Sequence, residues 1–70
     1  MADGYDFNID VLEPHGKVTE EVVTVMIPDY DQAKKLAVEV IEEQYADKQH
    51  SYKVIGADVI YLGARGIKYA

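Results

Sequence analysis

The chain has 70 residues, no cysteine, and 13 acidic against 7 basic residues, which gives a formal net charge of −6 at pH 7. This length allows one domain with a thin core, and the lack of cysteine excludes disulfides and thiolate metal sites. The acidic N-terminus has no apolar segment of the kind that forms a signal peptide or a membrane span, so we expect a single cytoplasmic domain over residues 1–70.

The charge is unevenly distributed along the chain. Residues 1–50 contain twelve acids and four lysines, a net charge of −8, whereas residues 51–70 contain one acid and three basic residues, a net charge of +2. A negative field repels phosphate backbones, which argues against nucleic-acid binding by the chain as a whole. The same field would attract a protein partner with a basic surface.

Two strands are predicted first. Apolar and polar residues alternate over Tyr5–Leu12, which predicts a strand with one buried face and one face in water. A turn at Glu13–Gly16 follows, in which proline and glycine supply the backbone angles that a turn needs. A second strand then covers Val18–Ile27 and ends at Pro28, because proline cannot donate a hydrogen bond to a sheet.

The two sides of the second strand differ in character. The side expected to face the core is apolar apart from its wet end, and it consists of Glu21, Val23, Val25 and Ile27. The opposite side contains Val22 and Met26 beside Glu20 and Thr24, and it is more apolar than contact with water requires. Since a small chain without disulfide or metal has little core, this side is a candidate for self-association.

The next predicted element is a helix over Tyr30–Ala46. Asp29 or Asp31 caps it, because either carboxylate can accept free backbone N–H groups in the first turn. Apolar residues at i, i+3, i+4 and i+7 spacing predict the buried stripe, which consists of Ala33, Leu36, Ala37, Val40, Ile41, Gln44 and Tyr45. The opposite side carries the charged residues Lys34, Lys35, Glu39, Glu42 and Glu43.

A polar loop over Asp47–Ser51 leads to a third predicted strand over Tyr52–Leu62. Gly56 marks either a bulge or a close approach of another backbone. Strict alternation places Val54, Ile60 and Leu62 on one face and Ile55, Ala57, Val59 and Tyr61 on the other. A turn at Gly63–Gly66 then allows Ile67–Tyr69 to return as a short fourth strand.

The element order is therefore ββαβ(β). A right-handed crossover through the helix makes the third strand parallel to the second, with the first strand between them. We predict an α+β fold with an antiparallel-dominated sheet in the strand order 2-1-3 and one helix packed on one face.

The sequence shows no catalytic constellation. Ser51 follows His50 directly, but neighbours on a loop seldom form a pair of nucleophile and base. Glu39, Glu42 and Glu43 share one helix face at a spacing that could hold a hard cation loosely, yet no further ligand loop accompanies them. We therefore expect a non-enzymatic protein with no metal and no cofactor.

The run EVVTVMIPDYDQAKKLAVEVIEEQYADK, followed by VIGADVIYL, resembles an arrangement of strands, turn, A-x-x-x-A helix and returning strand in several small proteins. In length and element order the chain is similar to small phage-encoded anti-CRISPR proteins and to an archaeal ribosomal protein of the LX type. The acidity departs from the ribosomal case. It suits an inhibitor that competes with nucleic acid for a basic groove.

Three functions fit these features. The first is a small acidic protein that docks on a larger protein partner, as an inhibitor of a host nucleic-acid-handling or defence complex. Its candidate binding residues are Asp6, Asp10, Glu20, Tyr30, Glu39, Glu42 and Glu43. The second is an accessory domain that self-associates through Val22 and Met26, and the third is a nucleic-acid binder that uses the basic C-terminal hairpin of Lys53, Arg65 and Lys68.

Overall fold

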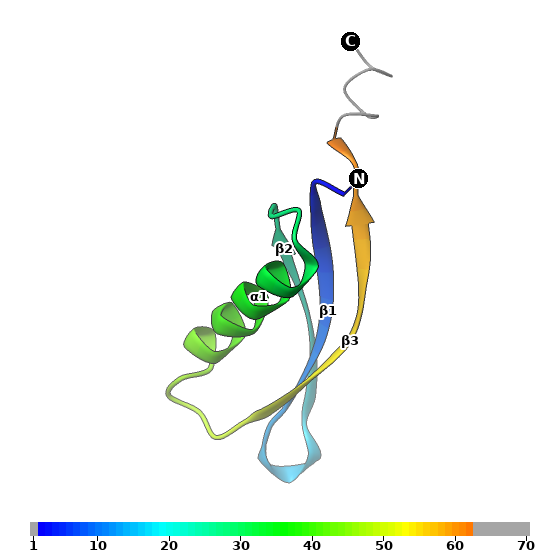
Figure 1. Cartoon of the computed structure of the whole chain (residues 1–70). Helices are drawn as coiled ribbons and strands as arrows, with labels where there is room; N and C mark the ends of the chain where they lie inside the picture. The colour runs from blue at the N-terminus through cyan, green and yellow to red at the C-terminus, as the bar shows by residue number, and fades with distance from the viewer. Residues whose placement is uncertain (1, 63–70) are drawn as a thin grey trace.

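A computed structural model of the chain describes residues 2–62, which form three strands and one helix (Figure 1). In chain order these are β1 (Gly4–Leu12), β2 (Val18–Val25), α1 (Tyr30–Gln44) and β3 (Ser51–Ile60). β1 lies in the middle of the sheet and pairs antiparallel with both neighbours, in the order β2-β1-β3. The predicted α+β fold and strand order are confirmed, while the predicted fourth strand, Ile67–Tyr69, lies outside the described residues.

β1 and β2 form a hairpin whose register is regular along its whole length. The turn between them holds a short 3-10 segment, η1 (Pro14–Gly16). His15 and Gly16 have φ angles of 71° and 78°, in the left-handed region that glycine adopts without strain. The backbone N–H of Glu13 donates to the carbonyl oxygen of Lys17 at 2.8 Å and closes the turn.

A β-bulge interrupts the pairing of β1 with β3. Asn8 lies opposite Gly56 and the next residue, Ile9, lies opposite Val54, so Ile55 is an extra residue in β3. A bulge reverses the alternation of side chains beyond it. The helix side of β3 therefore carries Tyr52, Val54, Ala57 and Val59, and its other side carries Lys53, Ile55, Asp58 and Ile60.

The bulge at Gly56 is one of the two predicted alternatives and is confirmed. The predicted division of β3 into faces is wrong, because strict alternation assumes that no residue is inserted. Ala57 and Val59 lie with Val54 toward the helix, and Ile60 lies with Ile55 on the opposite side.

The core lies between α1 and the sheet. Its buried residues are Phe7, Ile9, Val11, Val25, Ala33, Ala37, Ile41 and Tyr45. Ala33, Ala37 and Ile41 lie four residues apart in α1, and the C-cap Tyr45 follows at the same spacing, so they form one narrow stripe along the helix. Two of them are alanines, which lets the helix backbone come close to the strands.

Three residues of the predicted buried stripe are exposed, so this part of the prediction is wrong. Leu36 and Val40 are 42% and 41% exposed, and Gln44 is exposed as well. The physical reason is that α1 packs mainly on β1 and β2 and lies away from β3 (Figure 1). A sheet only two strands wide beneath the helix covers its central stripe and leaves the flanks in contact with water.

The start of α1 follows the prediction closely. Asp29 is the N-cap, and its Oδ2 accepts the backbone N–H of Gln32 at 2.9 Å. The helix ends at Gln44, two residues before the predicted Ala46, where the backbone N–H of Tyr45 donates to the carbonyl oxygens of the last turn. The remaining boundaries differ from the prediction by one or two residues.

Candidate protein-interaction face

The sheet has one face that α1 does not cover, which we call the open face. Its residues alternate with the core residues along each strand. They are Gly4, Asp6, Asn8, Asp10 and Leu12 from β1, Val18, Glu20, Val22 and Thr24 from β2, Met26 just after β2, and Lys53, Ile55, Asp58 and Ile60 from β3. Along β1, apolar rows and acidic rows follow one another across this face.

Two acidic rows cross the open face. In one row Asp10 lies directly opposite Glu20, and in the other Asp6 lies directly opposite Asp58. Like charges placed directly opposite each other across strands are destabilising. Lys53, on the far side of Asp10, is the basic residue of this face, and none of the four carboxylates forms an ion pair with a described residue.

An apolar row lies between the acidic rows. Val22 and Ile55 are 63% and 55% exposed, and Asn8 lies between them on β1. Together with Asp10 and Glu20 they line a hollow of about 300 Å³. Val22 is the most exposed of the large apolar side chains in the described part of the chain.

Apolar residues also occupy the two ends of the open face. At one end Leu12 lies opposite Val18, and both are exposed. At the other end Met26 lies against Gly4, where a Cβ atom would come within 2.7 Å of the methionine sulfur and 2.6 Å of the Val25 carbonyl oxygen. Only glycine leaves room for this approach, so the packing of Met26 at this end of the face depends on Gly4.

The structure brings together only some of the predicted binding residues. Asp6, Asp10 and Glu20 share the open face with the two residues predicted for self-association, Val22 and Met26. The other four, Tyr30, Glu39, Glu42 and Glu43, belong to α1 on the opposite side of the sheet. Tyr30 packs edge-on against Tyr5, with 5.3 Å between ring centroids, although it stays 41% exposed.

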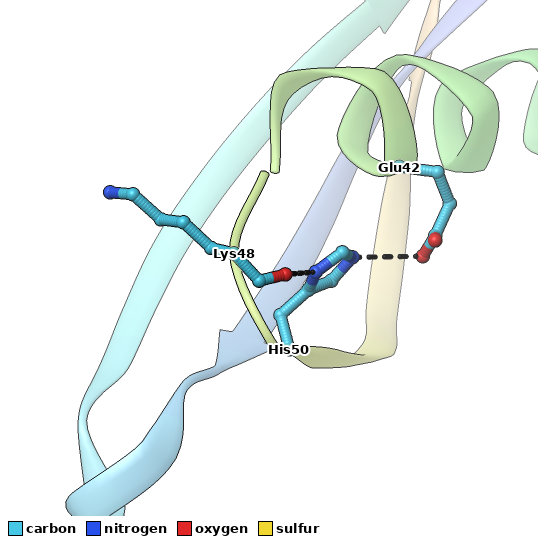
Figure 2. A network of polar contacts seen from close by, with 3 residues as sticks. All are labelled: Glu42, Lys48 and His50. Atoms are coloured by element: carbon cyan, nitrogen blue, oxygen red, sulfur yellow. Dashed lines mark hydrogen bonds and ion pairs between the residues drawn. The ribbon is translucent and has the colours of Figure 1, made fainter. Parts of the chain in front are cut away.

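Glu42 takes part in a polar network at the end of α1 (Figure 2). His50 places Nε2 at 3.2 Å from Glu42 Oε1 and Nδ1 at 2.8 Å from the carbonyl oxygen of Lys48, and its side chain is only 8% exposed. Both partners are acceptors, so an imidazolium with two N–H groups satisfies both, whereas a neutral ring satisfies only one. Glu42 therefore holds the loop before β3 onto the helix.

The pKa of His50 is raised from its ordinary value, in keeping with this geometry. The hydrogen bond to the Lys48 carbonyl is the largest cause; burial opposes it, and the hydrogen bond to Glu42 and the charges of Glu42 and Glu13 add to it. No local pattern predicts this network, because His50 and Glu42 are eight residues apart across a polar loop. Only the path of the chain after α1 brings them together.

A second contact that the sequence did not predict joins β2 to α1. The hydroxyl of Tyr45 donates to Glu21 Oε2 at 2.5 Å, and Gln44 Nε2 lies 3.5 Å from the same oxygen. The pKa of Tyr45 is raised, first by this hydrogen bond to Glu21, then by burial and by the charge of Glu21. Glu21 was expected at the wet end of a core face, and its contacts with the helix side chains explain its position there.

The described residues offer little support for the other predicted sites. Among residues 2–62 no three acidic or histidine side chains come together in a way that could hold a metal ion. Of the predicted basic hairpin, Lys53 lies opposite Asp10 on the open face, while Arg65 and Lys68 lie outside the described residues. None of the helices within residues 2–62 has the length and apolar character needed to cross a membrane.

No family model, no curated protein and no solved structure matches this chain. The similarity in element order to anti-CRISPR proteins and to the LX-type ribosomal protein therefore stays a prediction. The open face has to be interpreted from its own chemistry.

Proposed function

We propose that this protein is a non-enzymatic binding protein whose open face docks on a basic surface of a larger protein. The observation that carries the proposal is the pair of opposed carboxylates in each acidic row, Asp10 with Glu20 and Asp6 with Asp58. Such pairs disfavour the folded state of the free protein, and a basic partner would relieve the repulsion. Residues that break a local stability rule in this way are typical of functional sites.

The distance between the two acidic rows predicts how basic side chains are spaced on the partner surface. Asp10 lies four residues after Asp6 on β1, which corresponds to about 13 Å along a strand. A matching surface has basic side chains about this far apart with an apolar side chain between them, which would enter the hollow beside Val22 and Ile55. Burying that apolar side chain would supply affinity, and the charges would supply orientation and a fast on-rate.

The class of partner follows from the same chemistry. Extended basic grooves on proteins commonly bind nucleic-acid phosphates, so an acidic face of this kind would compete with nucleic acid for such a groove. This mode of action fits a cytoplasmic, phage-encoded inhibitor of a nucleic-acid-handling or defence complex. The similarity in element order to anti-CRISPR proteins supports that choice of partner class.

The test compares two isosteric double variants in affinity capture from the native host. Glu20→Gln with Asp58→Asn removes one charge from each acidic row, and Glu39→Gln with Glu43→Gln removes two charges from the helix as a matched control. We expect a partner that is retained by the wild type and by the helix variant and is lost by the open-face variant. Added heparin should release the partner if its surface is a nucleic-acid groove.

The opposite pattern would contradict the proposal. Loss of the partner with the helix variant, together with retention by the open-face variant, would place the binding site on α1. Retention that does not respond to heparin or to salt would remove the electrostatic argument.

A further inference from the structure

The outer edge of β2 has no strand paired with it among residues 2–62. β2 is eight residues long, contains neither proline nor lysine, and pairs with β1 without a bulge. Proteins usually protect an edge with such devices, because unpaired N–H and C=O groups invite another strand. The outer strand on the other side of the sheet, β3, does contain a bulge and a lysine, Lys53.

An apolar flank of α1 lies above this edge. Successive residues of a helix are about 100° apart, so Leu36 and Val38 lie on opposite sides of the buried Ala37. Val38 lines a hollow together with Tyr52 of β3, which identifies its flank as the one toward β3. Leu36, and Val40 one turn further on, therefore lie on the flank toward β2, where both are exposed.

The edge and the flank lie at the same level along the molecule. The end of α1 is held beside Glu21 by Gln44 and Tyr45, and the start of α1 follows closely after Val25. The helix is therefore level with the half of β2 that runs from Glu21 to Val25, and Val40 lies nearer than Leu36 to the level of Glu21. A two-fold axis through the middle of β2 would also pass between two copies of the part of this flank that holds Val40.

We propose that two copies of this chain associate through the outer edges of β2, forming one continuous six-stranded antiparallel sheet. Leu36 and Val40 of one protomer then pack against the same flank of its partner. A second copy is the occupant that the features favour, because a strand edge in antiparallel pairing and an apolar flank centred on the same axis both complement themselves.

Charge selects the register of the two β2 strands. Centring the pair on Val22 places the most exposed apolar side chain against its own copy and puts Glu20 opposite Thr24 and Glu21 opposite Val23. No carboxylate then faces another carboxylate within this strand pair. Stacking two open faces, by contrast, would bring four carboxylates of one copy against four of the other. This repulsion disfavours stacking, so in the proposed dimer Val22 contributes to self-association through the strand edge.

The absence of cysteine gives a direct test. Residues directly opposite in an antiparallel pair lie about 4.5–5.5 Å apart at Cα, which suits a disulfide. Val22→Cys should therefore oxidise rapidly to a covalent dimer. Ile55→Cys is the matched control, because it is equally apolar and exposed on the same face but lies on β3.

A second measurement is the mass in solution, which should be twice the 7.9 kDa of one chain at high micromolar concentration. Val40→Lys should raise the dimer dissociation constant by about tenfold or more, while Val59→Lys, at a similarly exposed position on β3, should leave it unchanged. A wild-type mass of one chain would overturn the proposal. So would oxidation of Val22→Cys that is no faster than that of Ile55→Cys.

Discussion

The two faces of the sheet are built from the same strands but differ in the contacts that their side chains make. On the helix side of β1, Phe7, Ile9 and Val11 are at most 1% exposed, and within residues 2–62 no buried side-chain polar atom lacks a hydrogen bond. On the open side of the same strand, Asp6 and Asp10 oppose further carboxylates. Stability is therefore concentrated on the helix side, whereas the carboxylates on the open side repel each other, and water and salt screen this repulsion only in part.

Because of this difference between the faces, substitutions that strongly lower the free energy of unfolding should be confined to a few core positions. Among residues 2–62 the core contains eight buried apolar residues, two of which are alanines. A domain with so small a core has a free energy of unfolding that a single large-to-small substitution can reduce severely. Changes on the open face should act mainly on binding.

The largest expected effect is on the helix side. Ile41→Ala should lower the free energy of unfolding by about 2–5 kcal/mol, because Ile41 is fully buried between α1 and the sheet. Leu36→Ala should cost about 1 kcal/mol at low micromolar concentration, because Leu36 is 42% exposed on the flank. Chemical denaturation of both variants checks the difference, and equal losses would show that the orientation of α1 is wrong.

The next effect concerns the one place where the open face is closely packed. Gly4→Ala should destabilise the fold by about 1–3 kcal/mol, because its Cβ would overlap the Val25 carbonyl oxygen, which cannot move without distorting β2. Gly56→Ala is the control, since no atom lies within 4 Å of the added Cβ and its φ is not in the left-handed region. Thermal melts should separate the two variants clearly; similar melting temperatures would contradict the close approach of Met26.

A smaller effect of opposite sign is expected in the acidic rows. Glu20→Gln should raise the free energy of unfolding by about 0.2–1 kcal/mol, because it removes the charge opposite Asp10 and leaves the shape of the face unchanged. The gain should shrink as salt is added. Glu39→Gln on the helix serves as the control, and a loss of stability with Glu20→Gln would mean that the acidic rows are not repulsive.

The smallest effect is a pH dependence at the loop before β3. The pKa of His50 is raised in the folded state, so its contribution to stability is fully present below its ordinary pKa of about 6.5 and is lost as pH rises through the folded pKa. The stability difference between the wild type and His50→Gln should therefore be larger at about pH 5.5 than at about pH 8.5.

Glu42→Gln is the matched partner variant for this measurement. It removes the carboxylate that accepts from His50 Nε2, so its stability difference from the wild type should fade over the same pH range. A difference that grows with pH for either variant would show that the neutral imidazole is the form that the folded protein prefers.

Local signals along the chain were enough to predict the elements and their order. The alternation over Tyr5–Leu12, the stop at Pro28 and the cap at Asp29 are local signals, because each depends on backbone geometry within a few residues. The rule for right-handed crossovers then left one sheet order, 2-1-3, which the structure has. The acids and apolar residues that β1 and β2 place on the open face could also be named in advance, since they occupy every second position of these two strands.

Packing between distant segments determines which of these residues lie side by side. The helix rests on two strands only, so Leu36 and Val40 lie on a flank although their spacing is that of a buried stripe. The inserted Ile55 turns Ile60 and Asp58 onto the open face, and the path of the loop after α1 carries His50 to Glu42. Periodicity records which side of its own element a residue lies on, but the width of the surface beneath a helix, an inserted residue and the course of a loop depend on packing between distant segments.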